Sequence, residues 1–320
     1  MGKVVSICIP IFNQIRFVKD LIHSIKSNQN KKVEFIICDN NSSDGTYEVL
    51  LKNKKYFKLF RNKKNVGFLK NFLKTIKKSN SEYITFLGGD DVIYSIKNLL
   101  SICTFMKDKD ISMGFSPIYL FSEKIKDKKL HFNFKKKIFY DYEDAILNNW
   151  LNSVLASFGG WIVKTKELKK INLKKIPSKS IFPTYHIGFQ IIYVQKKISA
   201  IFSKPFYIQR NGNNPNQLAN LQYLSFNNFI EIYKIFTKIK NKKIFYQVKK
   251  QFIKVIIKNA VSFKVYNGNI KDLIKFIKKH TINKKLTLFE IMFIRIVQLT
   301  PAMVMRFLLL KYRSIKYKNN

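Results

Sequence analysis

The fold of this chain is decided by the stretch Val33-Glu34-Phe35-Ile36-Ile37-Cys38-Asp39-Asn40-Asn41-Ser42-Ser43-Asp44-Gly45-Thr46, in which an apolar run ends in a polar, acidic turn. A second stretch has the same design: Tyr83-Ile84-Thr85-Phe86-Leu87-Gly88-Gly89-Asp90-Asp91. Each apolar run is typical of a buried strand, and each turn then follows the carboxyl end of that strand. Because parallel sheets bind ligands at the carboxyl ends of their strands, we expect both acidic turns to lie at a binding site.

Outward from these stretches, the first 110 residues alternate between short β-branched runs and longer amphipathic segments. This βαβ rhythm predicts an α/β fold with a mixed, mostly parallel sheet flanked by helices. The expected strands cover 6–10, 33–38, 57–60 and 83–87, and the expected helices cover 15–27, 46–52, 68–78 and 95–107. Ser42, Ser43 and Asp44 offer N-cap chemistry for the second of these helices.

The rest of the chain is less regular. We expect a strand over 111–121, a basic loop or hairpin over 124–137, a helix over 142–155 and strands over 159–163 and 205–210. From about 221 onward the apolar residues recur at helical spacing. We therefore predict one domain over 1–218, with halves at 1–110 and 111–218, followed by a helical, basic C-terminal region over 219–320.

The composition describes a folded and strongly basic protein. The chain has 320 residues, 60 Lys and Arg against 19 Asp and Glu, and a formal net charge of +41. Its hydrophobic share of 46% argues against disorder. Such a charge attracts nucleic acid, an anionic lipid surface or a nucleotide-bearing substrate without selecting among them. The three cysteines lack metal-site spacing and the N-terminus passes directly into a strand, so we expect a reduced, cytoplasmic protein without a signal peptide.

The segment 286–312 is apolar but carries Glu290, Arg295 and Arg306, which argues against a membrane-spanning helix. Two interpretations are open: an interfacial helix on an anionic membrane surface, or a helix packed on the protein's own core. The basic residues after 310 favour the first, so we expect a peripheral position on the inner face of the cytoplasmic membrane.

Four motifs follow one another in the chain: Ser6-Ile7-Cys8-Ile9-Pro10-Ile11-Phe12-Asn13, then 38–46, then Asn65-Val66-Gly67-Phe68, then 86–91. Their residues and order resemble family 2 glycosyltransferases of the GT-A fold, specifically the bacterial members that build surface polysaccharides. The resemblance covers 4–110 and, more weakly, 155–215. It implies an inverting, metal-dependent enzyme that moves a sugar from a nucleotide-sugar donor, UDP or dTDP favoured, to a glycan or lipid-linked glycan in capsule, lipooligosaccharide or O-antigen synthesis.

For the donor site, a carboxylate at Asp39 can accept a hydrogen bond from a pyrimidine N3–H. The resemblance implies this base contact, and a merely turn-forming Asp39 is the alternative. It also implies Mn²⁺ or Mg²⁺ held by Asp90 and Asp91, which would neutralise the donor diphosphate. Many relatives carry a further carboxylate where this chain has Gly88. The other donor-binding candidates are Pro10, Phe12, Asn13, Asn41, Asn65, Gly67, Lys70, Gly89 and Arg210.

On the acceptor side, the resemblance implies a general base near the stretch 182–188, which has no carboxylate. His186 is our candidate, since an imidazole takes up a proton near neutral pH, and a helix-capping role for His186 is the alternative. Asp144 is the second candidate, although acids at a helix start also complement the helix dipole. Gly160 and Trp161 are the expected acceptor contacts, with the Trp161 ring stacked on a sugar ring, and packing of Trp161 in the protein core is the alternative.

Two other functions are open. A non-catalytic relative would keep the fold as a binding or scaffold module, and the missing carboxylate at Gly88 is consistent with that. A nucleic-acid-binding protein would fit the charge, but no zinc, RRM or helix-turn-helix pattern supports it, so no specific nucleic acid partner is expected.

Overall fold

The structure is a computed structural model that describes residues 2–121, 124–130, 135–147, 159–177, 180, 183–210, 230, 233–258, 271, 274–275, 288–301 and 303–305. Its contacts divide the chain into two units, Met1–Gly212 and Asn213–Asn320. The boundary that the sequence predicts after 218 lies outside the described residues. The two units are described separately below.

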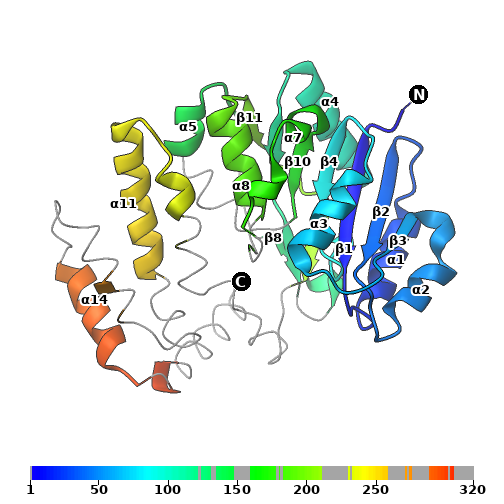
Figure 1. The fold of residues 1–320 in the computed structure, drawn as a ribbon, viewed down its shortest axis with the longest axis horizontal. Helices are drawn as coiled ribbons and strands as arrows, with labels where there is room; N and C mark the ends of the chain where they lie inside the picture. The colour runs from blue at the N-terminus through cyan, green and yellow to red at the C-terminus, as the bar shows by residue number, and fades with distance from the viewer. Residues whose placement is uncertain are drawn as a thin grey trace. The chain divides into compact units, whose positions relative to one another are not determined.

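The first unit is built on a mixed sheet of eight strands among the described residues, in the order β3-β2-β1-β4-β10-β6-β11-β9 (Figure 1). The strands are β1 Val5–Ile11, β2 Val33–Asp39, β3 Lys58–Arg61, β4 Tyr83–Phe86, β6 Met113–Phe115, β9 Lys137–Phe139, β10 Trp161–Lys164 and β11 Ser199–Ile201. The four strands β3, β2, β1 and β4 are parallel, and β10 runs antiparallel to both β4 and β6. The predicted α/β fold with a mixed sheet flanked by helices is confirmed.

Strands β1 and β2 are buried at every position, which explains why both are continuous apolar runs in the sequence. In their parallel register Ile11 lies opposite Asp39, and Cys8 lies opposite Phe86 of β4. The carboxyl ends of β2, β1 and β4 are therefore neighbours along one edge of the sheet.

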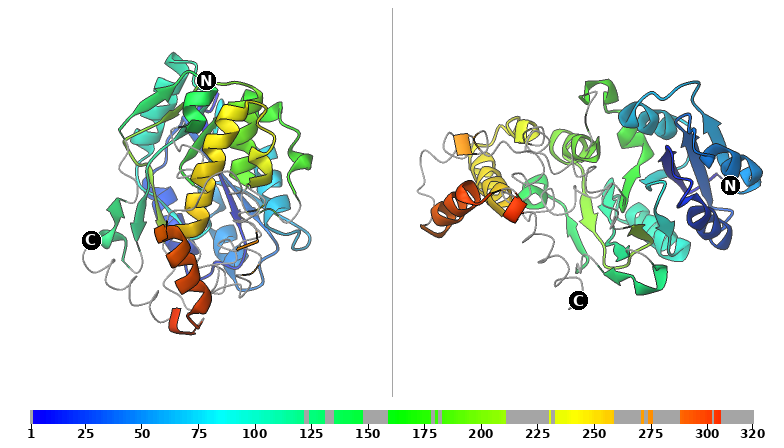
Figure 2. Two further views of the ribbon diagram at one scale, coloured as in Figure 1. Left: turned by 90° about the vertical axis from the view of Figure 1, so that its left-hand side faces the viewer. Right: turned by 90° about the horizontal axis from the view of Figure 1, so that it is seen from below.

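Helices cover both faces of this part of the sheet. They are α1 Val18–Ser27, α2 Thr46–Lys52, α3 Phe68–Lys77 and α4 Ile96–Asp108. Helix α3 packs on β1 and β2, and the right-hand view of Figure 2 shows α1 and α4 on the opposite face. Helix α1 begins at Val18, later than predicted, because the Gln14 carbonyl accepts the amides of Phe17 and Val18 and so closes a separate turn.

A second, smaller sheet has the order β5-β12-β7-β8 in the described part of the chain. Its strands are β5 Val92–Ile93, β7 Tyr119–Phe121, β8 Lys129–Leu130 and β12 Tyr207–Arg210. The prediction of one strand over 111–121 is wrong: β6 and β7 belong to different sheets. Pro117 lies between them and has no amide proton to donate to a neighbouring strand. Next to it, the Ser116 hydroxyl donates to the Lys204 carbonyl at 2.8 Å.

The remaining described elements of this unit lie in its second half. They are the helices α5 Tyr142–Leu147, α7 Thr165–Lys169 and α8 Pro183–Phe189, the last continued by a π-helical turn Gln190–Val194, and 3₁₀ turns at Lys54–Tyr56, Ile125–Asp127 and Leu173–Lys175. The helix predicted over 142–155 begins at Tyr142 as expected, and its part after 147 lies outside the described residues.

The second unit is helical where the structure describes it, with α11 Lys242–Lys258 and α14 Leu288–Leu299. The rings of Tyr233 and Phe236 lie 5.2 and 6.2 Å from the Phe252 ring, so the turn that precedes α11 packs back on it. Among the helices that the structure describes, none combines the length and the apolar character needed to cross a membrane.

Candidate functional site

The two acidic turns meet at the edge where β2, β1 and β4 end (Figure 1). β1 ends at Ile11, β2 at Asp39 and β4 at Phe86. The segments that follow these strands therefore lie next to one another, as the sequence predicts. They carry Phe12, Asn13, Asn41, Gly89, Asp90 and Asp91 among the candidates, and Pro10 is buried within β1 itself.

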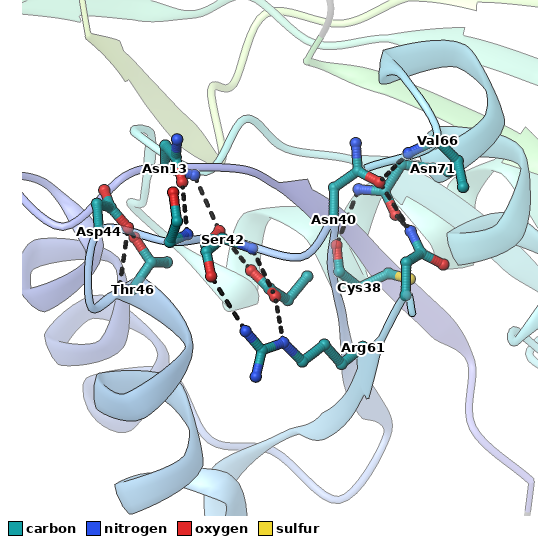
Figure 3. Close-up of polar contacts among 12 residues, drawn as sticks. Asn13, Cys38, Asn40, Ser42, Asp44, Thr46, Arg61, Val66 and Asn71 are labelled. Carbon is teal, nitrogen blue, oxygen red and sulfur yellow. Dashed lines mark hydrogen bonds and ion pairs between the residues drawn. The ribbon is translucent and has the colours of Figure 1, made fainter. Parts of the chain in front are cut away.

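The segment after β1 is held by side chains of the segment after β2 (Figure 3). Three consecutive backbone amides of the segment after β1 donate to these side chains: Asn13 N to Ser42 Oγ at 2.9 Å, Gln14 N to Thr46 Oγ1 at 2.8 Å and Ile15 N to Asp44 Oδ2 at 3.0 Å. In return, Asn13 Oδ1 accepts from the Ser43 amide at 3.0 Å. Because every one of these bonds closes within the chain, the floor of the site is ordered without a ligand.

Asp44 has a different role from the predicted N-cap. The N-cap of α2 is Gly45, and Asp44 Oδ1 accepts from Thr46 N at 3.0 Å and Thr46 Oγ1 at 2.6 Å. Burial acts to raise the pKa of Asp44, but the hydrogen bonds from Thr46 and Ile15 outweigh it and lower that pKa. Asp44 is therefore an ionised anchor for Ile15 and the start of α2.

Asp39 is completely buried. Its Oδ1 accepts from Ser42 Oγ at 2.5 Å, and its Oδ2 accepts from Ser42 N at 3.1 Å and pairs with Arg61 Nε at 3.3 Å. Arg61 in turn lies over the Tyr47 ring, 4.0 Å from its centroid. In this structure Asp39 orders the turn after β2, and its contact with a nucleotide base stays a prediction.

A buried asparagine network supports the next loop (Figure 3). Asn62 Nδ2 donates to Asn40 Oδ1 at 2.9 Å and to Asn71 Oδ1 at 2.8 Å, and Asn71 Nδ2 donates to the Cys38 carbonyl at 2.9 Å. Asn40 Nδ2 reaches Asn65 Oδ1 at 2.7 Å. The network connects the ends of β2 and β3 to α3, so it fixes the loop that carries two donor-site candidates, Asn65 and Gly67. A third, Lys70, is exposed on the first turn of α3.

The turn after β4 is organised by Asp91, which is only 5% exposed. Its Oδ2 accepts from Gly88 N at 3.0 Å and its Oδ1 accepts from Arg210 N at 3.1 Å. Burial raises the pKa of Asp91 well above its usual value, and the neighbouring Asp90 carboxylate raises it further. Asp91 thus closes the turn on itself and joins it to β12.

Arg210 completes this arrangement from the second sheet. Its guanidinium donates through Nη2 to Asp20 Oδ2 at 2.7 Å and through Nε to the Asp90 carbonyl at 3.2 Å. The rings of Phe17 and Phe121 lie on it, each with its centroid 4.4 Å away. Arg210 therefore ties α1, the Asp90 turn and β12 together, and its contact with a diphosphate stays a prediction.

Asp90 differs from its neighbours because its carboxylate accepts a hydrogen bond only from its own backbone amide within the described residues. Burial raises its pKa, against the opposing charge of Arg210. A half-buried carboxylate with so few hydrogen bonds is stabilised by a cation. Within the same residues no three His, Cys, Asp or Glu side chains lie together as a ready-made metal site. Asp90 thus fits a cation that also binds ligand oxygens, whereas both Asp91 oxygens already serve backbone amides.

The acceptor-side candidates lie on the second half of the unit. Antiparallel pairing of β10 with β4 puts Gly160, which has a φ of 84°, near the edge where β4 ends. Trp161 is completely buried and packs edge-on against Phe115, with ring centroids 5.2 Å apart. Its ring has no exposed face in this structure, which agrees with the alternative of core packing and not with sugar stacking.

The two base candidates have different surroundings. His186 is half-buried in α8, with buried residues on both sides of it in the chain. Asp144 forms an ion pair with Lys137 at 3.3 Å at the start of α5. The role of either residue as a base stays a prediction.

Several residues of this edge were not predicted from the sequence, namely Gln14, Asp20, Arg61 and Asn62. Asp20 and Arg210 are 190 positions apart in the chain, and no sequence motif contains both residues. Arg61 comes from β3 and reaches Asp39 only through the strand order. No local signal identifies such pairs.

Known proteins match this chain in sequence. A model of glycosyl transferase family 2 matches residues 6–170. RfbV, an abequosyltransferase of Salmonella typhimurium, is 34% identical over 95 residues, which are 28% of this chain and 28% of RfbV, so the match spans well under half of that protein. A processive diacylglycerol beta-glycosyltransferase of Mycoplasma genitalium is 26% identical over 247 residues, 73% of this chain and 71% of its own.

Solved structures match it in fold. TarS 1–349 of S. aureus superposes with a TM-score of 0.59 at 15% identity, over 83% of this chain and 74% of that one. Its complex with UDP-GlcNAc gives 0.59 at 14% identity, over 88% and 76%. The mannosyltransferase PcManGT of Pyrobaculum calidifontis, solved with GDP-Man and Mn²⁺, gives 0.54 at 12% identity, over 93% and 86%. At these identities the likeness concerns the fold alone.

Replacing Arg210 by Lys tests whether Arg210 anchors the Asp90 turn. An ammonium cannot donate to Asp20 and to the Asp90 carbonyl in the same fork geometry or fill the space between the two rings, so we expect the free energy of unfolding to fall by about 1–3 kcal/mol. Chemical denaturation measures this. The control is Arg16→Lys, an exposed arginine that also lies near Phe17, which should change stability by less than about 0.5 kcal/mol. Equal effects of the two changes would contradict the anchoring role.

Proposed function

The chain belongs to glycosyl transferase family 2, and from this membership we propose that it transfers a sugar, with inversion, from a nucleotide-sugar donor to a lipid-linked glycan or glycan acceptor in bacterial surface polysaccharide synthesis. The observation that carries the proposal is the half-buried Asp90 carboxylate, which accepts no hydrogen bond from another of the described residues and lies at the strand edge that also holds Asp39. A divalent cation and a diphosphate together would complete its coordination.

The relatives support the chemistry of the donor and the acceptor. TarS has been solved with UDP and with UDP-GlcNAc, and PcManGT with GDP-Man and Mn²⁺. The Mycoplasma relative is named for a diacylglycerol acceptor, and RfbV for transfer of abequose. These names favour a nucleotide-sugar donor, with UDP our first choice and dTDP the second, and an acceptor that carries a lipid.

In this proposal the residues of the edge have separate tasks. Asp90 would hold Mn²⁺ or Mg²⁺, whose charge stabilises the departing nucleoside diphosphate. Asp91 and Arg210 keep the Asp90 turn in place, through the bonds from the Gly88 and Arg210 amides and from the Arg210 guanidinium to the Asp90 carbonyl. His186, or in second place Asp144, takes the proton from the acceptor hydroxyl.

Changing Asp90 to Asn tests the donor site. Calorimetry with UDP, dTDP, CDP and GDP, each with and without Mn²⁺, should show metal-dependent binding of one nucleotide to the parent. In the variant that binding should weaken by at least about tenfold and sugar transfer by at least about 100-fold, because the cation loses its protein carboxylate. Asp108→Asn, an exposed acid at the end of α4, is the matched control and should behave as the parent. A parent that binds none of the four nucleotides would favour the non-catalytic module instead.

His186→Asn and Asp144→Asn distinguish the two candidate bases. Loss of the base should lower kcat by about 10²–10⁴-fold and leave the dissociation constant of the donor nucleotide within about twofold, since the base acts on the acceptor. Single-turnover rates at saturating donor measure this. Loss in the Asp144 variant alone would assign the base to Asp144, and full rates in both variants would contradict both assignments.

We also propose that α14 lies on an anionic membrane surface. In the described residues it exposes Met292 by 60%, Ile296 by 55% and Leu299 by 80%, with the exposed Arg295 among them. Apolar side chains beside a cation are typical of interfacial helices. Ile296→Glu with Leu299→Glu should reduce co-sedimentation with phosphatidylglycerol vesicles by more than about threefold. Leu51→Glu, an exposed apolar residue of α2, is the control, and equal sedimentation of all three proteins would contradict the proposal.

A further inference from the structure

Gln14 occupies a central position at the edge of the sheet. In the strand order β1 lies between β2 and β4. Asp39 ends β2, Asp90 follows β4, and Gln14 lies in the segment after β1. A ligand that extends from the Asp39 turn to the Asp90 turn must therefore cross the segment that carries Gln14.

The backbone of Gln14 is fixed from both sides. Its amide donates to Thr46 Oγ1 at 2.8 Å, and its carbonyl accepts from Phe17 N at 2.9 Å and Val18 N at 2.8 Å. Its side chain packs over the Asp90 turn: a Cβ built on Gly89 would lie 3.3 Å from Gln14 Cγ. The side chain of Gln14 thus begins from a rigid support and lies against the residue that precedes Asp90.

Within the described part of the chain, the amide group at the end of this side chain has no hydrogen-bond partner. Among the residues that the structure describes, none forms a hydrogen bond with it, although Gln14 is half-buried. The neighbouring polar groups of the edge differ in this respect, since Asn13, Ser42, Asp44 and Thr46 are all used in bonds within the chain. A primary amide offers two donors and a carbonyl acceptor, which suits hydroxyl groups.

This step rests on the proposed function: the order of base, ribose and diphosphate in the donor determines which of these groups lies next to Gln14. The base lies toward Asp39 and the diphosphate toward Asp90, and the sugar that joins them is the ribose. We propose that the Gln14 side-chain amide binds the ribose hydroxyls of the donor and so selects a ribonucleotide over a deoxyribonucleotide. UDP is then preferred to dTDP, because dTDP lacks the 2′-hydroxyl.

Gln14→Met tests this inference. Methionine keeps the length of the side chain and its packing on Gly89 but removes the amide. The probes are UDP, CDP and GDP, each paired with its 2′-deoxy form and measured by calorimetry with Mn²⁺. For the nucleotide that binds, we expect the parent to prefer the ribo form by about three- to tenfold, as one hydrogen bond gives. In the variant the ribo form should weaken by a similar factor and the preference should disappear.

The matched control is Gln29→Met, the same substitution just beyond the other end of α1, which should keep the parent's preference. A similar unfolding midpoint for parent and Gln14→Met shows that the variant is folded. If the parent binds a nucleotide but Gln14→Met keeps its preference for the ribo form, or if the parent has none, the inference is overturned and the proposed function stands. If the parent binds none of the probes with metal, both fail.

Discussion

The buried carboxylate of Asp91 is the constraint on which the candidate site depends. It accepts one amide from its own turn, at Gly88, and one from Arg210 on β12. A carboxylate taken out of water is costly unless donors replace the lost hydration, so this turn is stable only while β12 lies beside it. The second sheet, formed by segments far apart in the chain, thereby holds the turn that carries Asp90. Without it the Asp90 carboxylate would have no defined position relative to the end of β1.

At the rest of this edge, too, most polar groups form hydrogen bonds with other residues of the chain. The loops after β1 and β2 exchange hydrogen bonds, and the asparagine network does the same for the loop before α3. A site that is ordered in advance spends little binding energy on ordering itself. The exceptions are therefore informative: in the described part of the chain, no other residue forms a hydrogen bond with the Asp90 carboxylate or with the Gln14 side-chain amide. Both groups lie where a ligand crossing from β2 to β4 would supply those partners.

The sequence was sufficient for the parallel half of the sheet, because each of its strands is a continuous apolar run followed by a polar turn, and such runs have few alternative packings. It was also sufficient to predict that Asp39 and Asp90 lie at one edge of the sheet.

The sequence did not predict the positions of residues that depend on pairing between distant segments. The chain over 111–121 looks like one strand, yet Pro117 sends its two ends to different sheets. Tryptophan often stacks on sugar rings, but the antiparallel pairing of β10 buries Trp161 against Phe115. Likewise, nothing near Arg210 in the chain indicates that its partner is Asp20.

The packing around Gly88 explains why this chain cannot simply carry a further carboxylate there. A Cβ on Gly88 would lie 2.8 Å from Asp90 Oδ1 and 2.9 Å from Asp91 Oδ2. Asp91 cannot yield without losing its bond to the Gly88 amide, which closes the turn. A carboxylate at this position would also add a third negative charge next to Asp90 and Asp91, whose pKa values desolvation already raises. Glycine at 88 and the arrangement of Asp90 and Asp91 therefore depend on each other.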